Sequence, residues 1–578
     1  MRWTARSAEP DSSLVTSLQC EAQLHPLIAR LLAARGVRSV EEAACFLSPA
    51  LSHLHSPFAM LGMDVAVARL EAAIAAKEKV LIYGDYDVDG TVAIVLLRTA
   101  LELCGGAAGY HVPHRVRDGY GMKDQVIEQA AADGVRLIIS VDTGIRAFAA
   151  AEAAARAGVD LIVTDHHLPE SQEGVPRALA VLNPNQAGCG YPCKGLCGAG
   201  VAFKLAQALL QRAGQERLLP SFLKMVALAT IADAVPLAGE NRVIARLGLE
   251  GLRRPANAGL KALMEVASLD PAARPLTATD VAFRLAPRLN AAGRMDVARD
   301  VIELFSCSSP ENARAIALRL DRLNGERQQE EHRIVKEIFA RLDADPEVRH
   351  SHCLVVEGEG WHRGVIGIVA TRVVERYGRP ALVVSTGDGE AHGSGRSIPG
   401  FHLLEALESC RQLFERFGGH AAAVGCTLPA TRLPELRSAL EAFARARLTE
   451  DDFAPSLALD AELSLEEITP QLHGALQQLA PFGVGNPEPV FAARGVRLLQ
   501  PPRLLKDIHV KLRVAASSAG RSFDALGWRM AERIAPLSLV AGDSLDIAFT
   551  VEENTHPDFG GLQLELRDVA KIQKLAAV

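Results

Sequence analysis

The chain has 578 residues, of which 49% are hydrophobic and 23% are charged, and this is the composition of an ordinary globular protein. The length exceeds what one hydrophobic core supports, so we expect several domains. The formal net charge of −7 argues against a general nucleic-acid coat protein but permits a local basic track. We find neither a long apolar run nor an apolar segment after the first residues, so we expect no membrane span, no secretory signal and a cytoplasmic location.

The ten cysteines are sparse for this length and indicate reduced thiols. Cys189, Cys193 and Cys197 are spaced four residues apart, whereas zinc ribbons pair two C-x-x-C knuckles. Because the spacing differs and no fourth ligand is evident, we favour a loop with incidental thiols over a metal site and leave the role of these residues open.

The pattern of the chain changes at about residue 76. Before this point, residues 1–75 carry apolar side chains at helical spacing and predict a small N-terminal helical cap. After it, strands are predicted at 80–83, 135–141 and 161–163, with helices at 91–104 and 146–157. Repeated strand–helix units of this length predict a doubly wound parallel sheet, in which ligands bind at the carboxyl ends of the strands.

The first predicted strand leads directly into Asp85, Asp87 and Asp89. In an extended chain, alternate residues project to the same side. Three carboxylates on one side repel one another unless a multivalent cation neutralises them, so the sequence predicts a site for a hard metal ion. A solvated acidic turn is the alternative.

Acidic and imidazole groups also follow the other predicted strands. The second strand ends at Asp142, and the third ends at Asp165-His166-His167. A later helical segment, 223–231, is followed by Asp233. Because all of these positions lie where a parallel sheet collects its ligands, we favour the metal interpretation over packed or solvated side chains.

Four short motifs around these residues, G-D-Y-D-V-D-G, V-D-T-G, T-D-H-H and A-D-A-V-P-L, resemble those of the DHH phosphoesterase superfamily. Over about residues 60–570 the chain resembles the bacterial RecJ family of single-strand-specific exonucleases. Further blocks carry this likeness, at 283–294, 361–369, 393–397, 417–420 and 481–487. Family II pyrophosphatases place a histidine four residues before Asp87, where this chain has Tyr83. That departure puts pyrophosphatase activity in doubt.

The resemblance implies a set of site residues. Two hard cations, Mn²⁺ or Mg²⁺, would be held by the metal ligands Asp87, Asp89, Asp142, His166 and Asp233, with Asp85 as a sixth ligand. Asp142 is the expected bridge between the ions. In the expected catalytic pair, His167 would orient or polarise the phosphate and Asp165 would support a ligand. Substrate-binding candidates are Tyr120, Arg288, Asn290, Arg294, Ser394, Arg396 and His420.

Residues 310–344 form a charged segment with apolar residues at helical spacing, and this pattern predicts a long helix that bridges domains. A coiled-coil partner helix is the alternative. After it, apolar runs at 353–357 and 381–385 flank a helix that begins near Gly364, as expected for a second small α/β domain. The glycine-rich loops around Ser394, Arg396 and His420 suit phosphate, although each loop alone could be a tight turn.

Beyond about residue 490, short segments alternate with period two, at 494–499, 508–514, 545–551 and 562–566. They predict a small OB-like β-barrel, a fold that often binds single strands through a basic groove. Lys506, Lys511, Arg513 and Arg521 could supply the charge, or they could be ordinary surface cations.

The predicted architecture is therefore multidomain α/β. Its parts are an N-terminal helical cap (1–75), a DHH phosphoesterase domain with a parallel sheet (76–305), a connecting helix (306–347), a DHH-associated α/β domain (348–452) and an OB-like nucleic-acid-binding domain (453–578). The resemblance implies a two-metal phosphodiesterase that degrades single-stranded DNA 5′→3′ to mononucleotides in DNA repair and recombination. Expected partners are single-stranded DNA, a single-strand-binding protein and a helicase, with no membrane.

Two rival functions stay open at this point. A phosphodiesterase for short oligonucleotides or cyclic dinucleotides would share the metal site, and the extra C-terminal barrel argues against it. A DNA-binding scaffold that has lost its metals would lack part of the ligand set, whereas the whole expected set is present here.

Overall fold

The structure is a computed structural model that describes residues 1–115, 117–119, 121–170, 173–295, 298–516, 520–554 and 560–572. The chain divides into two compact units, each described here by itself. The two-sheet unit comprises residues 54–235 and 244–454. The barrel unit comprises residues 1–53, 236–243 and 455–578.

The two-sheet unit begins with a five-stranded parallel sheet in the order β3-β2-β4-β5-β6. Its strands are β2 (Lys79–Gly84), β3 (Ala108–His111), β4 (Val135–Val141), β5 (Asp160–Thr164) and β6 (Ala180–Leu182). The central strands are aliphatic along almost their whole length because both faces of the sheet are covered. The predicted parallel sheet is confirmed, and the two edge strands β3 and β6 are additions that are too short to show in the pattern.

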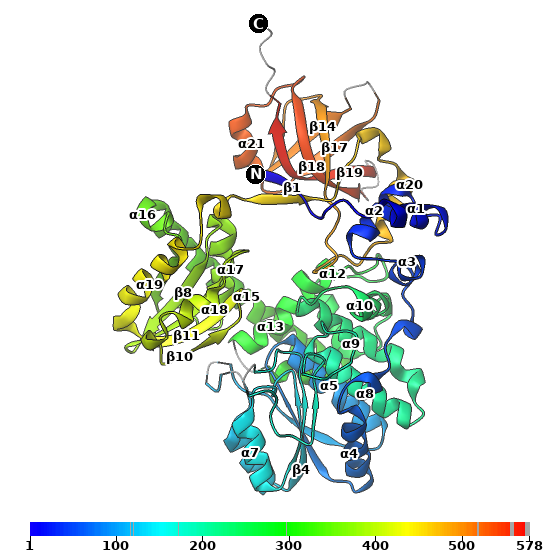
Figure 1. The fold of residues 1–578 in the computed structure, drawn as a ribbon, viewed down its shortest axis with the longest axis vertical. Coiled ribbons are helices and arrows are strands. Elements are labelled where there is room, and N and C mark those ends of the chain that lie inside the picture. The colour runs from blue at the N-terminus through cyan, green and yellow to red at the C-terminus, as the bar shows by residue number, and fades with distance from the viewer. Residues whose placement is uncertain are drawn as a thin grey trace. The chain divides into compact units, whose positions relative to one another are not determined.

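Helices cover both faces of this sheet (Figure 1). α6 (Asp124–Ala132) and α7 (Phe148–Ala157) pack on one face in a cluster with Ile138 and Leu161. α4 (Met63–Ala75), α5 (Val88–Leu103) and α8 (Gly198–Arg212) lie on the other face, followed by α9 (Leu219–Ala232). Together the sheet and these helices are the parallel-sheet domain, and all βα connections deliver their loops to the carboxyl edge of the sheet.

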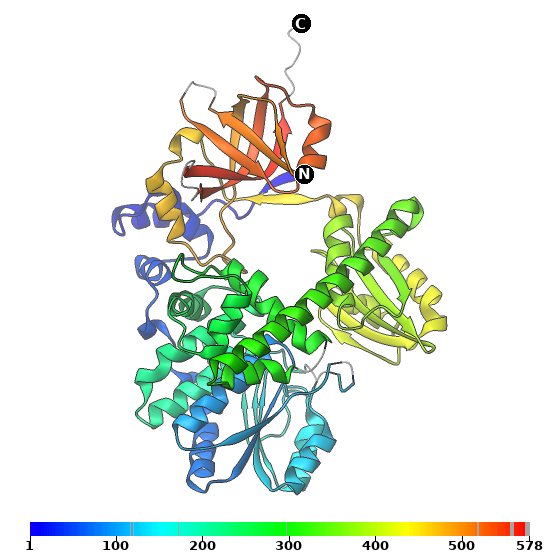
Figure 2. The same ribbon diagram turned by 180° about the vertical axis from the view of Figure 1, so that it is seen from behind.

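A single long helix, α15 (Pro310–Ala344), follows a group of helices that includes α13 (Ala286–Met295) and α14 (Arg299–Ser306). Ser309 caps its first turn, Pro310 occupies the position where no N–H is needed, and Gly325 does not interrupt it. Its first half packs against α13 and its second half against α17 (Ile366–Tyr377), so the predicted bridging helix is confirmed (Figure 2). Ile334, Ile338 and Leu342 are buried within the unit, which accounts for the apolar stripe without a coiled-coil partner.

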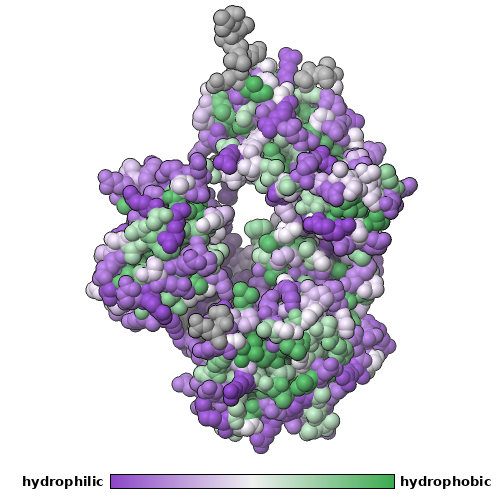
Figure 3. Space-filling view, viewed as in Figure 1, coloured by the Kyte–Doolittle hydropathy of each residue, from purple (hydrophilic) through white to green (hydrophobic). Residues whose placement is uncertain are grey.

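The second sheet of this unit has the order β10-β11-β9-β8-β7, with only β7 and β8 parallel. Its strands are β7 (Leu354–Glu359), β8 (Ala381–Gly387), β9 (Glu390–Arg396), β10 (Arg416–Gly419) and β11 (Ala423–Pro429). α15 and α17 cover one face, and α18 (Leu403–Glu408) and α19 (Leu433–Arg445) cover the other. The outer surface over α18 and α19 is mostly hydrophilic, as expected for amphipathic helices (Figure 3). We call this part, residues 350–454, the mixed-sheet domain.

The barrel unit contains a closed five-stranded barrel. Its strands are β14 (Phe491–Leu498), β16 (His509–Ala515), β17 (Ser522–Gly527), β18 (Ser544–Asn554) and β19 (Gly561–Lys571). They follow the order β14-β18-β19-β17-β16, and a β14–β16 pairing closes the ring. The OB-like barrel is confirmed, with β17 as a strand that the sequence pattern did not predict.

Residues 1–53 belong to the barrel unit, whereas residues 54–75 of the predicted N-terminal cap belong to the two-sheet unit. α1 (Ser12–Cys20), α2 (Pro26–Ala34) and α3 (Val40–Leu47) share one hydrophobic cluster with the barrel and with α20 (Pro470–Gln477). A short strand, β1 (Arg2–Ala5), pairs in parallel with β12 (Ser456–Leu459). None of the helices in the described part of the chain has both the length and the apolar character needed to cross a membrane.

Candidate metal centre

The loop after β2 brings three aspartates to the carboxyl edge of the parallel sheet, but not in the extended form that the sequence predicted. Asp85 follows the strand, Asp87 is the N-cap of α5, and Asp89 lies in the first turn of that helix. The Asp87 side chain accepts a hydrogen bond from the Gly90 N–H at 3.1 Å, as N-cap aspartates do. The expected alternation along a strand is therefore wrong, and helix geometry places these carboxylates instead.

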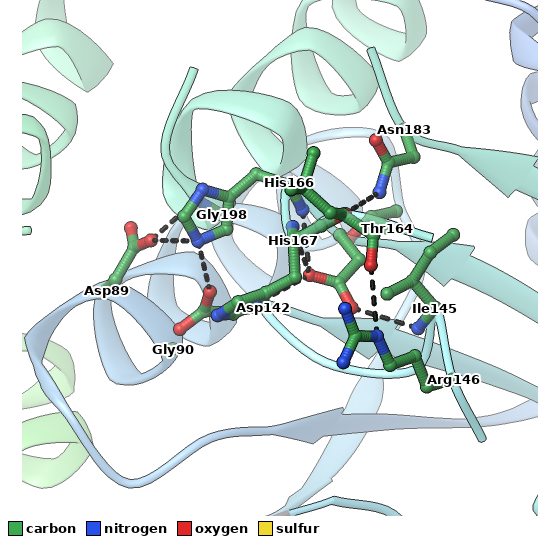
Figure 4. Close-up of polar contacts among 12 residues, drawn as sticks. Asp89, Gly90, Asp142, Ile145, Arg146, Thr164, His166, His167, Asn183 and Gly198 are labelled. Carbon is green, nitrogen blue, oxygen red and sulfur yellow. Dashed lines mark hydrogen bonds and ion pairs between the residues drawn. The ribbon is translucent and has the colours of Figure 1, made fainter. Parts of the chain in front are cut away.

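The other predicted ligands arrive from three further elements. Asp142 follows β4 with a positive φ of 58°, His166 lies in the loop after β5, and Asp233 caps the end of α9. His166 Nε2 lies 3.3 Å from Asp142 Oδ1 and 3.8 Å from Asp89 Oδ2 (Figure 4). It also lies 3.8 Å from Asp233 Oδ2.

These side chains form three overlapping groups whose ligand atoms lie within 4.8 Å of one another: Asp85 with Asp87 and Asp142, Asp89 with His166 and Asp233, and Asp142 with His166 and His167. Asp142 and His166 each belong to two groups.

Backbone amides fix Asp89, the most buried of the predicted metal-ligand carboxylates. At the N-terminus of α8, the N–H groups of Gly198 and Ala199 donate to the two oxygens of Asp89 at 2.5 and 2.8 Å. A side chain at position 198 would begin 2.4 Å from Asp142 Oδ1, so this helix approaches the centre closely only because glycine is there. The helix N-terminus also carries partial positive charge, which favours an ionised carboxylate.

Asn290 supports the same loop. It was predicted to bind substrate, but its Oδ1 accepts the N–H of Val88, the first residue of α5, at 3.1 Å. Gly293, in the same helix, faces the Tyr86 carbonyl at a distance that leaves no room for a side chain. α13 therefore supports the aspartate loop, and Asn290 contributes to this support through its Oδ1, while its predicted contact with substrate stays a prediction.

The carboxylates at this centre repel one another strongly. Burial and the charges of Asp89, Asp87, Asp85 and Asp233 raise the pKa of Asp142 well above its usual value. Burial, followed by Asp89 and Asp87, raises the pKa of Asp233 to about 9. Burial lowers the pKa of His166 and favours the neutral imidazole that a metal ion needs. Such a cluster is stable in its ionised form only with cations present.

One atom shows directly that the residues fit a hard cation. Asp85 Oδ1 is buried, and among the described residues no group donates a hydrogen bond to it. A buried oxygen without a donor is costly unless a metal ion takes that place. The donor set of carboxylates and one or two imidazoles suits Mn²⁺ or Mg²⁺.

His167 and Asp165 form a separate pair beside the ligands. His167 Nδ1 lies 2.8 Å from Asp165 Oδ1, and the N–H of Ile145 donates to Asp165 Oδ2 at 2.9 Å. Burial alone would lower the pKa of His167, but the hydrogen bond and charge of Asp165 outweigh it and raise this pKa. The two neighbouring imidazoles are therefore shifted in opposite directions, with the pKa of His167 raised and that of His166 lowered.

Arg115, Arg294 and Arg396 lie close enough to influence one another electrostatically, and Asp87 acts on Arg294 as well. Burial, followed by the charge of Arg115, lowers the pKa of Arg294 to about 9, and Arg396 also lowers it. Burial and Arg115 lower the pKa of Arg396 in the same way. Ser394 and Arg396 lie on β9 and face the start of α17. A Cβ on Gly367 of that helix would begin 2.9 Å from Ser394 Oγ. This cluster of Arg115, Arg294 and Arg396 needs an anion, and Arg115 had not been singled out because its segment has no strand or helix pattern.

The other predicted substrate contacts are placed differently. Arg288 donates to Asp321 at 2.8 Å and to the Arg284 carbonyl, so it holds α13 against α15 and does not join the arginine cluster. His420 lines a cavity of about 460 Å³ together with His167, Asp165, Arg146, Thr143 and Met122, of which the last three had not been predicted. Tyr120 lies outside the described residues.

The cysteines do not form a metal site within the described part of the chain. Cys197 is buried and caps α8, accepting the Gly200 N–H at its Sγ, 3.4 Å away. Burial, followed by Asp89 and Asp233, raises its pKa well above the usual value, so Cys197 stays a neutral thiol. Its role is to begin the helix that holds Asp89.

A parallel sheet that gathers carboxylates and imidazoles at its edge, joined by a long helix to a mixed sheet that bears Ser394 and Arg396, is the architecture of a phosphoesterase of the DHH class. Family models agree: residues 79–230 match the DHH family N-terminal domain, residues 350–446 the DHHA1 domain and residues 459–568 the RecJ OB domain.

Curated relatives narrow the class to one family. The chain is 37% identical to the single-stranded-DNA-specific exonuclease RecJ of Dickeya dadantii, covering 96% of this chain and 95% of that protein. It is 37% identical to RecJ of Bacillus subtilis, over 99% of this chain and 71% of that protein. RecJ of Thermus thermophilus in complex with Mn²⁺ has a similar structure, with a TM-score of 0.84, 29% identity, and coverage of 99% of this chain and 80% of that one. The chain belongs to the RecJ family.

Proposed function

We propose that this protein is a metal-dependent exonuclease that hydrolyses single-stranded DNA from its 5′ end and releases 5′-mononucleotides. The observation that carries the proposal is the convergence of Asp85, Asp89, Asp142, His166 and Asp233 at one edge of the sheet, with a buried Asp85 oxygen that lacks a donor among the described residues. The RecJ relatives are single-stranded-DNA-specific exonucleases, and a Thermus thermophilus member is known with Mg²⁺ as well as Mn²⁺.

We assign the ligands as two sets that share Asp142. Asp85, Asp87 and Asp142 would hold one ion, and Asp89, His166, Asp233 and Asp142 would hold the other. Bound Mn²⁺ or Mg²⁺ supplies Lewis acidity at the scissile phosphate and lowers the pKa of a water nucleophile. The protein contributes the fixed positions, because the amides of Gly198 and Ala199 set the orientation of Asp89 before any ion arrives.

We assign stabilisation of the leaving group to His167. Hydrolysis forms a bond from water oxygen to phosphorus and breaks the bond from phosphorus to the 3′ oxygen of the terminal nucleotide. The 3′ oxygen becomes negative as it leaves, and a cationic imidazole beside it stabilises that charge. Asp165 keeps His167 charged and oriented, so Asp165 acts as a positioning residue.

The arginine cluster supports the preference for a 5′ end. A terminal phosphate carries about −1.5 to −2 charge at pH 7, whereas an internal phosphodiester carries a single negative charge. Arg115, Arg294 and Arg396 together favour the more highly charged group, and Ser394 adds a hydroxyl donor. A terminal phosphate held there, next to the metal centre, places the first linkage of the strand at the metals.

We propose that the barrel binds the rest of the DNA strand, because OB folds commonly bind single strands. Of the four cations suggested for it, Lys511 and Arg513 both pair with Asp524, and Arg521 donates to the Ile468 carbonyl. Lys506 is exposed in the turn between β15 (Arg503–Leu505) and β16. We propose Lys506 as the contact among these four.

Partners and location complete the proposal. An enzyme restricted to single strands needs duplex DNA to be opened, so we propose a helicase and a single-strand-binding protein as partners in DNA repair and recombination. We also propose a cytoplasmic location.

The test is digestion of a strand labelled at one end or the other. With Mn²⁺ or Mg²⁺, label at the 5′ end should appear in mononucleotides first, and chelator should abolish the reaction. First release of the 3′ label would refute the polarity while leaving the phosphoesterase chemistry intact. Faster hydrolysis of dinucleotides than of long strands would instead favour the small-substrate phosphodiesterase.

A further inference from the structure

On one face of the mixed sheet, α17 packs against β8 and β9, while the outer strands β10 and β11 present exposed residues. On β11, Val424, Cys426 and Leu428 are buried in the cluster with α18 and α19, and Ala391 of β9 joins them. The intervening residues of these strands project from the opposite face, since side chains alternate along a strand. On that face Arg416, Gly418 and Gly425 are exposed.

Strand register arranges this face of the mixed sheet in three rows that cross β10, β11 and β9. The inner row is His420, Ala423 and Arg396, the glycine row is Gly418, Gly425 and Ser394, and the outer row is Arg416, Thr427 and His392. Successive rows are two residues apart along each strand, which is roughly 6.6–6.8 Å. That step is on the order of one nucleotide of an extended single strand.

The inner row belongs to the site already described. His420 lines the cavity that contains His167, and Arg396 belongs to the arginine cluster. The sheet therefore starts at the metal centre and leads away from it.

Neither the available space nor the backbone conformation requires glycine in the glycine row. A Cβ on Gly418 would meet nothing within 4 Å, and one on Gly425 would meet only the Gly393 carbonyl at 3.9 Å. Neither residue has the positive φ that would require glycine. Glycine inside a strand weakens it and often marks a place where a ligand comes close to the backbone. Two such glycines side by side leave the backbone open beside Ser394, and we call this stretch, Gly418 and Gly425 with Ser394, the trough.

The outer row carries positive charge at the far side of the trough. Arg363, in the loop before α17, lies with Nη2 2.7 Å from His392 Nδ1, and His392 Nε2 lies 3.1 Å from Glu390. His392 therefore orients the Arg363 guanidinium over the sheet. Partial burial and the nearby Arg416 lower the pKa of Arg363, while Glu390 raises it, which shows that the two arginines share one field. With one carboxylate against two guanidinium groups, the outer row keeps a net positive charge.

We propose that Arg363, His392 and Arg416 form a further phosphate subsite, which holds a phosphate of the bound nucleic acid beyond the glycine row and separate from the arginine cluster. The inference rests on the proposed function. The strand would cross the trough with its backbone against the sheet, where the glycines leave room for it. Phosphate contacts fix position and carry no base preference, so the subsite serves strands of any sequence.

The test measures binding of a 5′-phosphorylated single strand of about twelve nucleotides, with Ca²⁺ replacing Mn²⁺ to prevent hydrolysis. Arg416→Gln and Arg363→Gln should each weaken binding on the order of 3- to 10-fold and reduce the slope of log K against log salt by about 0.7, the value for one phosphate contact on a single strand. Arg437→Gln is the matched control, because Arg437 is an exposed arginine on α19 that faces away from the trough. It should leave both quantities unchanged.

Two substrate series locate the phosphate. If it is internal, one methylphosphonate linkage at the contacted position abolishes the difference between wild type and Arg416→Gln. A difference that appears only with a 5′-triphosphate would instead place the phosphate in a group attached to the 5′ end and would overturn the path of the strand across the trough. Gly425→Ala should weaken binding without lowering Tm, because its Cβ enters open space.

Binding by Arg416→Gln and Arg363→Gln equal to that of Arg437→Gln on every strand would overturn the subsite. Unchanged binding by Gly425→Ala would overturn the path across the trough. Failure of the proposed function would look different, because the wild-type protein itself would then neither bind nor hydrolyse single strands.

Discussion

The metal centre gathers carboxylates, and the arginine cluster gathers guanidinium groups in the same unit. The two clusters are held in place in different ways. The carboxylates are fixed by the main chain: amides of α8 hold Asp89, and the start of α5 positions Asp87. The arginines have looser supports, since Arg294 donates to the Gly364 carbonyl at 3.2 Å and Arg115 lies 4.8 Å from the Tyr86 ring centroid. The carboxylates are thus oriented by the main chain before any ion binds, whereas the arginine side chains have fewer fixed contacts.

The largest effect should come from the metal side. Asp142→Asn removes the carboxylate shared by both ligand sets, so kcat should fall on the order of 10³-fold. The same change removes a buried charge that four aspartates repel, so the metal-free variant should be more stable than the metal-free wild type. Steady-state kinetics with Mn²⁺ and thermal unfolding with chelator measure the two effects.

The surface variant Asp133→Asn is the control for this experiment, because Asp133 is exposed at the end of α6. Near-normal turnover by Asp142→Asn would remove the metal centre from the mechanism.

A smaller effect is expected on the arginine side. Arg294→Gln should raise KM for 5′-phosphorylated strands by about 10- to 100-fold, the scale of a charged hydrogen bond, and should change KM much less for strands with a 5′ hydroxyl. Arg288→Gln is the internal comparison, because it breaks the contact with Asp321. It should lower Tm and leave the preference for a 5′ phosphate intact. Equal preference loss in both variants would show that the arginine cluster does not recognise the terminal phosphate.

The charge on the metal side also predicts a dependence on pH. The pKa of Asp233 is about 9 in the folded protein, above its ordinary value of 3.8, because of burial and then Asp89 and Asp87. The folded state therefore binds more protons than the unfolded one, and metal-free stability declines as pH rises through this window. Metal ions displace these protons, so the Tm difference between Mn²⁺-loaded and chelated protein should increase between about pH 6 and about pH 8. A constant difference would contradict the proposed repulsion.

The smallest effect should come from Cys197→Ser. Serine is a favourable N-cap, so α8 should still begin at the same residue and hold Asp89, with activity and Mn²⁺ affinity within about twofold of wild type. Loss of a bound metal ion in this variant would show that the thiol is a ligand rather than a cap. Mn²⁺ titration and kinetics distinguish the outcomes.

Local pattern was enough to find Asp85, Asp142 and His166 after predicted strands and Asp233 after a predicted helix, which is why these four were predicted together. The pattern wrongly predicted an extended chain through the three aspartates. A polar residue after an apolar run can either continue an extended strand or cap a new helix, and the pattern alone does not distinguish the two. The identity of Asp87 as the cap depends on where α5 starts, and Asn290, some two hundred residues later, helps to set that start.

Features that depend on pairing distant segments could not be predicted. β1 pairs with β12 across most of the chain, and no local period indicates this partner. The rows on the mixed sheet depend on the register of β10, β11 and β9, and Arg363 joins them from a different loop. Arg288 shows the converse: the family motif placed it near substrate, and only the structure shows its contact with Asp321.

The most direct test of the central claim is a Mn²⁺ titration followed by electron paramagnetic resonance. If Asp142 links the two ligand sets, the wild-type protein should bind two Mn²⁺ per chain with an exchange-coupled spectrum, and Asp142→Asn should lose the coupling. One bound ion, or two ions whose uncoupled spectrum is the same in both proteins, would contradict a shared two-metal centre.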